Sequence, residues 1–183
     1  GGEPLLREDF SDIYLYLKKK GFLISVFTNA TLITMEHVSL FKKYPPRDLE
    51  VTVYGVTKET YEQVTQTPGS FDAFQNGLNM LLDAGIKVGL KAMAMKSNFH
   101  ELDKIRQFCE ANSENSFRFD PFLNLRYDRN PALNDIIMSE RLDAEQIKAL
   151  ELSDPKRCQD IARMLGEDNI EEASDSHFNH IFR

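Results

Sequence analysis

Residues 10–29 read Phe-Ser-Asp-Ile-Tyr-Leu-Tyr-Leu-Lys-Lys-Lys-Gly-Phe-Leu-Ile-Ser-Val-Phe-Thr-Asn, and the hydrophobic period changes within them. The first half carries apolar side chains at the spacing of one helical face, at Phe10, Ile13, Tyr14 and Leu17. Gly21 is suited to end that helix. Residues 22–27 then form an almost continuous apolar run, which is typical of a strand buried on both faces. This stretch therefore predicts a helix that leads directly into a buried strand.

The same alternation continues along the chain. Strands are expected at 22–27, 50–54, 86–94 and 117–123. Helices are expected between them, over 34–44, from Thr57 as N-cap, from Ser70 as N-cap to Gly85, and from Asn98 with Glu101 as a capping box. Strands that recur about every 30 residues with a helix between them indicate βα units. The fold class that we predict is therefore α/β with a parallel sheet.

The pattern changes after residue 126, so we expect a first domain at 1–126 and a loop and helical extension at 127–183. Residues 124–139 are polar and contain Pro131, and they are interpreted as an extended loop. C-terminal helices should follow, one capped by Asp143 and one opened by Asp154 with Pro155. A last helix in the tail after Gly166 is expected only from a weak pattern.

Composition narrows the class of protein. The 183 residues carry a formal charge of −7 without a dense basic stripe, which argues against a nucleic-acid partner. No apolar run approaches the roughly 20 residues that span a bilayer, so we expect no membrane partner and a cytoplasmic protein. The two cysteines, Cys109 and Cys158, are far apart and lie in helical patterns, which predicts neither a disulfide framework nor a metal site.

The chain opens on Gly1-Gly2-Glu3-Pro4, which is typical of a turn after a strand. Glycines let the backbone turn and approach a bound molecule closely. The Glu3 carboxylate, together with the glycine backbone, could receive an ammonium group. The alternative is an ordinary glycine-proline turn with a solvated glutamate.

Residues at the carboxyl ends of parallel strands carry function in such sheets. Here those stretches, taken in order, resemble the radical S-adenosylmethionine (radical SAM) enzymes, and in particular the SPASM-type branch of peptide-modifying and maturase enzymes. The matching stretches are residues 1–4, 27–33, 51–55, 67–71 and 90–98. The resemblance covers about residues 1 to 126, and it implies a partial (βα) barrel that binds S-adenosylmethionine.

The resemblance also assigns roles to single residues. The cofactor-binding residues that it implies are Gly1, Gly2 and Glu3 for the methionine amino group, Thr28 and Asn29 facing the cavity, Thr52 near the ribose, and Lys91 bordering the nucleoside. Substrate-side residues are Tyr54, Asp120, Asn124 and Arg126, and Tyr54 departs from the aspartate that is common in relatives. Simpler interpretations stay open: Thr28-Asn29 as a turn, Thr52 as an ordinary strand residue and Lys91 as a surface cation.

One family feature is absent from the sequence: the Cys-x3-Cys-x2-Cys motif that binds a 4Fe-4S cluster. We therefore expect a fragment of an enzyme whose cluster ligands and cysteine-rich C-terminal domain lie elsewhere, with no metal or catalytic residue in this chain. Cys109 and Cys158 are interpreted as packing residues. The parent would cleave S-adenosylmethionine to a 5′-deoxyadenosyl radical that abstracts hydrogen from a peptide or small molecule, and this chain alone would be inactive.

Two other classes of function remain open from the sequence. A βα sheet can also carry a non-redox metabolite enzyme or ligand-binding domain, because this architecture hosts many functions. A peptide-binding maturation scaffold without catalysis is the other alternative. In a fragment whose preceding strands lie elsewhere, the first strand would lack a neighbour and leave a sheet edge through which the chain could self-associate.

Overall fold

The computed structural model describes residues 2–114, 117–154, 158, 159 and 163. By their internal contacts the residues divide into two compact units, 1–123 and 124–183, and each is described by itself. No helix among the described residues is both long and apolar enough to cross a membrane.

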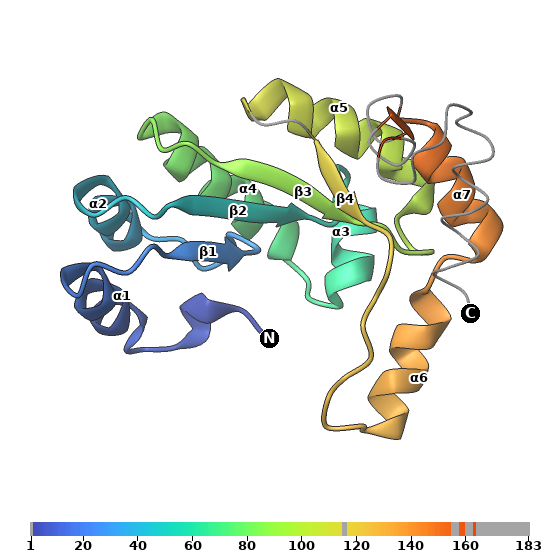
Figure 1. Ribbon diagram of the computed structural model, residues 1–183, viewed down its shortest axis with the longest axis horizontal. Helices are drawn as coiled ribbons and strands as arrows, with labels where there is room; N and C mark the ends of the chain where they lie inside the picture. The colour runs from blue at the N-terminus through green and yellow to red at the C-terminus, as the bar shows by residue number, and fades with distance from the viewer. Residues whose placement is uncertain (1, 115–116, 155–157, 160–162, 164–183) are drawn as a thin grey trace. The chain divides into compact units, whose positions relative to one another are not determined.

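The first unit contains one sheet of four strands in the order β1-β2-β3-β4 (Figure 1). The strands are β1 (Ser25–Thr28), β2 (Asp48–Val53), β3 (Gly89–Met93) and β4 (Arg118–Asp120). All three pairings are parallel, with Val26 opposite Leu49, Val51 opposite Leu90 and Ala92 opposite Phe119. The predicted parallel α/β fold is thus confirmed, although β1 and β4 are shorter than the apolar runs that predicted them.

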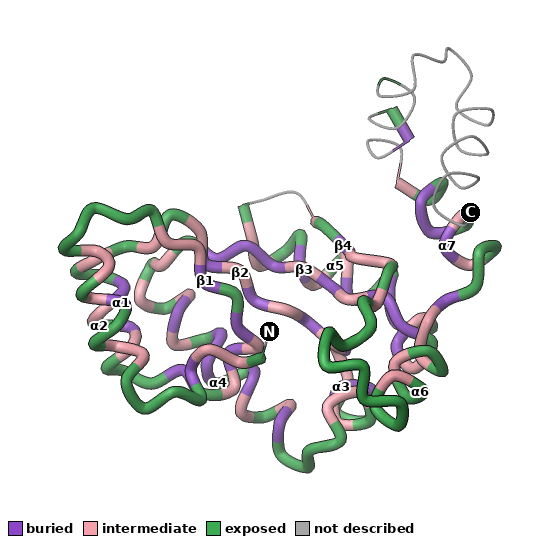
Figure 2. The backbone as a smooth tube through the Cα atoms, turned by 60° about the horizontal axis from the view of Figure 1, so that its bottom comes forward, coloured by how far each residue is buried: buried purple, intermediate pink, exposed green. Residues whose placement is uncertain are grey.

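Helices connect the strands and pack on the sheet. They are η1 (Pro4–Leu6), α1 (Phe10–Lys19), α2 (Met35–Lys43), α3 (Lys58–Thr65), α4 (Ser70–Asp83), η2 (Phe99–Glu101) and α5 (Leu102–Asn112). In β2, Leu49, Val51 and Val53 are buried, whereas the intervening residues are half-buried (Figure 2). This period of two means that one face of the sheet forms the core with the helices, and the other face carries polar side chains.

The prediction of a first strand buried on both faces was wrong. Phe22, Leu23 and Phe27 are all exposed, and the exposed fraction of Leu23 is 77%. Only Val26 and Thr28, which point to the opposite face of β1, are buried. Among the described residues, helices therefore cover only one face of this strand. An apolar run in the sequence does not predict whether one face or both faces of a strand are covered.

Two predicted helix caps were also wrong. Gly69, with φ of 81°, is the N-cap of α4, and Ser70 is the first helical residue, with its hydroxyl 2.6 Å from that of Thr65. The Asn98 side chain caps no helix, and the Glu101 side chain binds another turn of the chain. Local spacing suggested caps, but the Ser70 hydroxyl bonds to Thr65, whereas Asn98 reaches Tyr54 and Glu101 reaches Val56, both distant in sequence.

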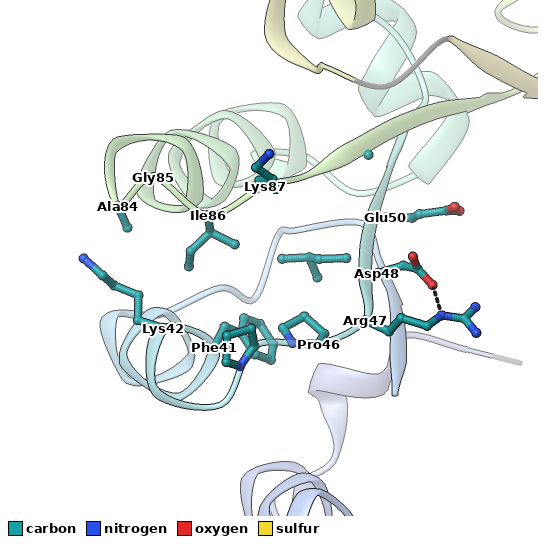
Figure 3. A pocket seen from close by; sticks show the side chains of 13 residues that line it. Phe41, Lys42, Pro46, Arg47, Asp48, Glu50, Ala84, Gly85, Ile86 and Lys87 are labelled. Atoms are coloured by element: carbon teal, nitrogen blue, oxygen red, sulfur yellow. Dashed lines mark hydrogen bonds and ion pairs between the residues drawn. The ribbon is translucent and has the colours of Figure 1, made fainter. Parts of the chain in front are cut away.

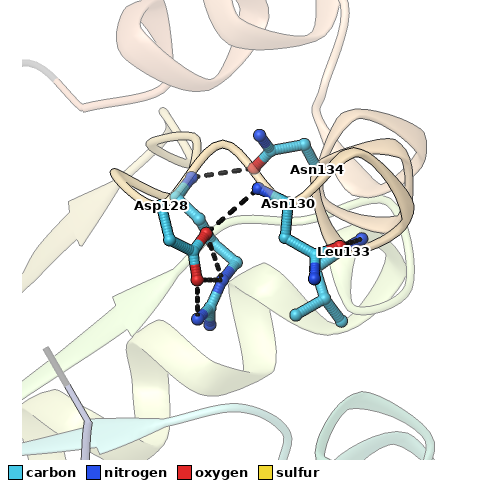
Figure 4. Close-up of polar contacts among 5 residues, drawn as sticks. Asp128, Asn130, Leu133 and Asn134 are labelled. Carbon is cyan, nitrogen blue, oxygen red and sulfur yellow. Dashed lines mark hydrogen bonds and ion pairs between the residues drawn. The ribbon is translucent and has the colours of Figure 1, made fainter.

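The second unit contains α6 (Pro131–Glu140) and α7 (Ala144–Leu152). The helix α6 contradicts the predicted extended loop. The Asn130 side chain accepts a hydrogen bond from Leu133 N (Figure 4). Pro131 occupies the first helical turn, where it is tolerated. Asp143 caps α7 with reciprocal bonds to Gln146, so that predicted helix is confirmed. The predicted helix from Pro155 and the tail helix fall mostly outside the described residues.

Candidate functional site

The Glu3 carboxylate is anchored to the carboxyl end of β1. Its Oε1 accepts hydrogen bonds from Leu5 N (3.1 Å) and Thr28 Oγ1 (2.7 Å), and its Oε2 accepts one from Asn29 N (2.8 Å). A carboxylate offers about four acceptor positions, so these three donors leave room for a further one. Nothing lies within 4 Å of a Cβ built on Gly2, so the backbone beside Glu3 is open. Gly1 lies outside the described residues.

The turn that follows β1 is built by side-chain hydrogen bonds. Thr28 is buried, and its Oγ1 also accepts a hydrogen bond from Ala30 N at 3.0 Å. Asn29 Oδ1 accepts from Thr31 N at 3.0 Å and from Thr31 Oγ1 at 2.7 Å. Thr28-Asn29 therefore does form a turn, and the same turn brings the Asn29 side chain to the carboxyl edge of the sheet.

A cavity of about 510 Å³ opens at this carboxyl edge. Its lining includes Asn29, Thr31, Thr52, Tyr54, Lys91, Met93, Met95 and Asp120. Five of the residues that the sequence singled out thus meet at one cavity, although they come from four different strand ends. Glu3 and Thr28 are not among the lining residues, but the Glu3 carboxylate accepts a hydrogen bond from Asn29 N, and Asn29 does line the cavity.

Thr52 and Lys91 lie opposite each other in the β2–β3 register, so their side chains are on the same face of the sheet. Lys91 Nζ is 3.7 Å from Glu50 Oε2, 3.5 Å from Asp120 Oδ2 and 4.8 Å from the centre of the Phe27 ring. The Lys91 side chain is 17% exposed. The surface-cation interpretation of Lys91 is therefore wrong, because the residue belongs to a charged row on the polar face of the sheet.

The charge of Glu50 is shared between two cations. Its Oε2 accepts a hydrogen bond of 2.7 Å from Arg118 Nη2, which is shorter than its contact with Lys91. Asp120, at the end of β4, has its carboxylate near Lys91 at the rim of the cavity. Lys91 is thus held between two carboxylates by charge rather than by a short hydrogen bond, and its ammonium group can still donate to a ligand.

An aromatic cluster forms the wall behind Tyr54. The Tyr54 ring packs edge-on against Tyr61 at 5.8 Å, and Tyr61 stacks on Phe74 at 4.8 Å. Tyr61 is fully buried, and its hydroxyl donates to Asn29 O at 3.4 Å. Burial, and secondarily the nearby Glu3 charge, raises the pKa of Tyr54, so this phenol stays protonated and can donate a hydrogen bond.

Asn124 and Arg126 belong to the second unit and are not among the residues that line the cavity. The Arg126 guanidinium binds Asp128, which is its neighbour two positions away, and Arg126 N donates to Asn134 Oδ1 at 2.8 Å (Figure 4). The hydrogen bond and charge of Asp128 raise the pKa of Arg126. The assignment of Asn124 and Arg126 to the substrate side remains a prediction.

A second cavity, of about 540 Å³, lies at the opposite, amino end of β2 and β3 (Figure 3). Lys42, Arg47 and Lys87 lie at its edge, and Arg47 Nε binds Asp48 Oδ2 at 2.7 Å. None of the predicted site residues lines it. Ligands of parallel α/β sheets bind beyond the carboxyl ends of the strands, so the cavity at that edge is the candidate site.

Comparison with known proteins shows the superfamily of this chain. The sequence signature of the Radical SAM superfamily matches residues 1–109. This chain belongs to the radical SAM superfamily. The resemblance inferred from the strand-end motifs is therefore confirmed at the level of the superfamily.

Individual relatives are longer than the stretch that this chain matches. An AdoMet-dependent heme synthase of Nitratidesulfovibrio vulgaris is 27% identical over 139 residues, which are 76% of this chain and 37% of that protein. An Fe-coproporphyrin III synthase of Methanosarcina barkeri is 33% identical over 110 residues, which are 60% of this chain and 27% of that protein. The chain thus spans less than two fifths of the length of these relatives.

A solved structure supports the fold. The structure described as native anSMEcpe with bound AdoMet and Cp18Cys peptide superposes with a TM-score of 0.61 at 15% identity, and the match covers 81% of this chain and 42% of that one. At this identity the similarity shows that the two chains share a fold. The predicted partial barrel of the radical SAM type is consistent with it.

Radical SAM membership implies an iron-sulfur cluster, but the residues of this chain do not fit one. The described residues contain no group of three or more Cys, His, Asp or Glu placed to hold a metal ion. Cys109 is buried in α5, where burial and then Glu110 raise the pKa of its thiol to about 12. Cys158 is also buried, and burial, followed by Asp154, raises its pKa. Both thiols are therefore packing groups, because a metal ligand must be a thiolate.

Sequence reasoning missed several residues of the site. Met93 and Met95 line the cavity, and Thr31 joins them through the turn after β1. In the sequence, Met93 and Met95 have the pattern of ordinary strand residues, so nothing marked them as part of a site. Asn98 and Glu101 were interpreted as a helix cap, yet both are buried and hydrogen-bonded behind the cavity. The burial of Asn98 could not be recognised from local sequence, since its partner Tyr54 lies 44 positions away at the end of another strand.

Proposed function

We propose that residues 1–123 form the S-adenosylmethionine-binding part of a radical SAM enzyme. The observation that carries this proposal is the convergence of Asn29, Thr52, Tyr54, Lys91 and Asp120 on one cavity at the carboxyl edge of the sheet. Superfamily membership supports it. In such enzymes the bound cofactor supplies a 5′-deoxyadenosyl radical that abstracts hydrogen from the substrate, and the protein supplies position and electrostatics.

The donors and acceptors at the cavity suit the parts of this cofactor. The free acceptor position of Glu3 and the open backbone at Gly2 suit the methionine ammonium group. The Thr52 hydroxyl and the Asn29 side chain can hydrogen-bond ribose hydroxyls. Tyr54 and the two methionines offer an apolar wall for the adenine ring.

Lys91 sets the charge of the cavity. Its neighbours Glu50 and Asp120 balance its charge, so the row as a whole does not repel a sulfonium cation. The ammonium group can donate to an acceptor of the cofactor or substrate at the same time. This role would make Lys91 a binding residue at the boundary between cofactor and substrate.

The whole enzyme would need a cluster whose three thiolates come from outside these 183 residues, because they contain only two cysteines. Two classes of substrate are supported by the names of relatives. One solved relative holds a peptide, and a 27% identical Bacillus subtilis relative is the antilisterial bacteriocin subtilosin biosynthesis protein AlbA, whereas the heme synthases are named for a small molecule. We propose a peptide or small-molecule substrate that enters beside Asp120.

Methionine methyl groups offer a direct test. With [methyl-13C]methionine, titration of S-adenosylmethionine or S-adenosylhomocysteine should shift the methyl signals of Met93 and Met95, which line the cavity. The exposed Met35 on α2 and Met138 on α6 should not shift. Signals at Met93 and Met95 that stay fixed up to millimolar ligand would contradict the proposal.

Two variants sharpen this titration. Thr52→Val removes a hydroxyl but keeps the shape of the side chain, and Lys91→Met keeps most of its stem while removing the charge. Each should weaken binding by about tenfold, the effect of one or two lost hydrogen bonds. Thr52→Ser retains the hydroxyl and serves as the control.

A further inference from the structure

Asn98 is a fully buried polar residue that forms hydrogen bonds to the ends of both β2 and β3. Its exposed fraction is 0%, although it follows an exposed lysine two positions earlier. Its Oδ1 accepts a hydrogen bond of 2.9 Å from Met95 N, and its Nδ2 donates to Tyr54 O and to Met93 O, each at 2.9 Å. One amide group therefore joins two strand ends that are 39 positions apart in sequence.

These bonds continue the sheet beyond its last regular pair. The final register partners of β2 and β3 are Val53 and Ala92. One residue further along each strand, the carbonyls of Tyr54 and Met93 both accept from Asn98 instead of from a strand neighbour. Without the amide, two carbonyls and the N–H of Met95 would lose these hydrogen bonds, a loss that folded proteins avoid.

Glu101 holds the next part of the same turn. It is 4% exposed, its Oε2 accepts from Val56 N at 2.9 Å and Thr57 N at 3.3 Å, and its Oε1 accepts from Thr57 Oγ1 at 2.6 Å. Gly55 lies between the two anchored segments, and a Cβ built on it would be 2.8 Å from Tyr61 N. The turn after β2 is thus fixed at both ends and pressed closely against α3.

The turn held in this way carries Tyr54, and the partner segment carries Met93 and Met95, all of which line the cavity. We propose that Asn98 is a positioning residue that sets the separation of these two cavity walls, and that Glu101 assists it by fixing the turn from Tyr54 to Thr57. The part of this proposal that concerns ligand affinity rests on the proposed function. The part that concerns the geometry of the walls does not.

The first test compares two destabilised variants. Asn98→Ala should move the methyl signals of Met93 and Met95 in the ligand-free protein and weaken S-adenosylhomocysteine binding by about tenfold or more, because two walls lose their common anchor. Val38→Ala creates a comparable loss in the core beneath α2, away from the cavity. It should leave those two signals in place and change affinity by less than about twofold. An Asn98→Ala protein whose Met93 and Met95 signals do not move would overturn the proposal.

The second test uses Asn98→Asp, which retains the size of the side chain. At pH 7 one carboxylate oxygen would still accept from Met95 N, but the other would face the carbonyls of Tyr54 and Met93 in a buried site, and burial with this repulsion should raise its pKa above the ordinary value of about 3.9. On acidification to about pH 5 the protonated group can donate one hydrogen bond, so the urea midpoint and the Met95 signal should return toward wild type. A side chain that only fills space would give a pH-independent deficit, and that result would contradict a hydrogen-bonding clamp.

The wild-type protein and the Asn98→Asp variant share the other ionisable groups near position 98. They are His100, whose Nε2 is 3.2 Å from Thr60 Oγ1, Glu101, and Tyr54 on the facing turn. Subtracting the wild-type pH profile removes their contribution. If wild type binds no S-adenosylhomocysteine while Asn98→Ala still moves both methionine signals, the proposed function fails and the positioning role stands.

Discussion

Thr28 Oγ1 donates a hydrogen bond of 2.7 Å to Glu3 Oε1, and this bond joins the first turn of the chain to the carboxyl end of β1. Asn29 N donates to the other carboxylate oxygen at 2.8 Å. Glu3 is therefore oriented before any ligand arrives, and a ligand ammonium group would have to use the acceptor position that remains. The orientation of this carboxylate depends directly on the hydroxyl of Thr28.

Thr28→Val should destabilise the first unit and loosen Glu3. The change removes the bond to Glu3 and also the acceptor for Ala30 N in a buried turn, so the free energy of unfolding should fall by about 1–3 kcal/mol. Urea unfolding followed by circular dichroism measures this loss. Thr28→Ser keeps the hydroxyl and should stay within about 1 kcal/mol of wild type. Equal stability of the valine and wild-type proteins would show that the two bonds contribute little.

Gly77 should resist even the smallest side chain. It lies within α4, and a Cβ on it would be 2.0 Å from the carbonyl oxygen of Ala30. Helix propensity alone would make Gly77→Ala stabilising by about 1 kcal/mol. We expect the opposite sign, a loss of about 2 kcal/mol or more, because the contact is with backbone. Asn76→Ala, on the exposed side of the same helix, is the control and should be neutral or slightly stabilising.

The ionised Glu101 should make stability depend on pH. Burial raises its pKa, but hydrogen bonds from Thr57, Val56 and Thr60 together outweigh burial, so the pKa lies below its ordinary value of 4.5. Its contribution is therefore present above pH 4.5 and is lost as the pH falls through the lowered pKa of the folded state. The difference in unfolding free energy between wild type and Glu101→Gln should be largest near neutral pH and shrink on acidification. Chemical denaturation across the acidic range measures it, and a difference independent of pH would contradict the assignment.

The exposed apolar residues at β1 should promote self-association. Within the described sheet β1 has one neighbouring strand, and Leu23 just before β1 and Phe27 on its open face are exposed. Light scattering should show a molar mass that rises with concentration, and Leu23→Lys should reduce this rise because a charge disfavours edge pairing. Leu152→Lys, at another exposed leucine, is the matched control. A constant monomer mass over a wide concentration range would disprove the prediction.

The chain alone should not assemble a stoichiometric 4Fe-4S cluster. Its two cysteines are buried with raised pKa values, and a cluster of this type needs closely spaced thiolates. Anaerobic incubation with iron and sulfide should therefore leave little iron bound after desalting, and addition of S-adenosylmethionine with dithionite should produce no 5′-deoxyadenosine. Cys109→Ser with Cys158→Ser should give the same low iron content. A stoichiometric cluster that disappears in this double variant would overturn the expectation.

The sequence by itself determined the order of the four strands, the helices between them and the parallel α/β class, but it did not predict α6. Hydrophobic period is a local property, so the change of period at Gly21 and the helical face that ends at Gly85 could be recognised without knowledge of the fold. The capping of α7 by Asp143 was also local, since its partner Gln146 is three positions away. The ordered motifs at strand ends were sufficient for the superfamily, because parallel strands bring their carboxyl ends to one edge.

The tertiary structure alone decided which polar residues are buried and what they bind. Asn98 reaches Tyr54 across 44 positions and Glu101 reaches Thr57 across 44, so their local spacing suggested a cap that does not form. The exposure of Phe27 likewise depends on whether anything covers the second face of the sheet. Buried polar groups must find partners wherever the chain provides them, and those partners are set by packing between distant segments rather than by neighbours in sequence.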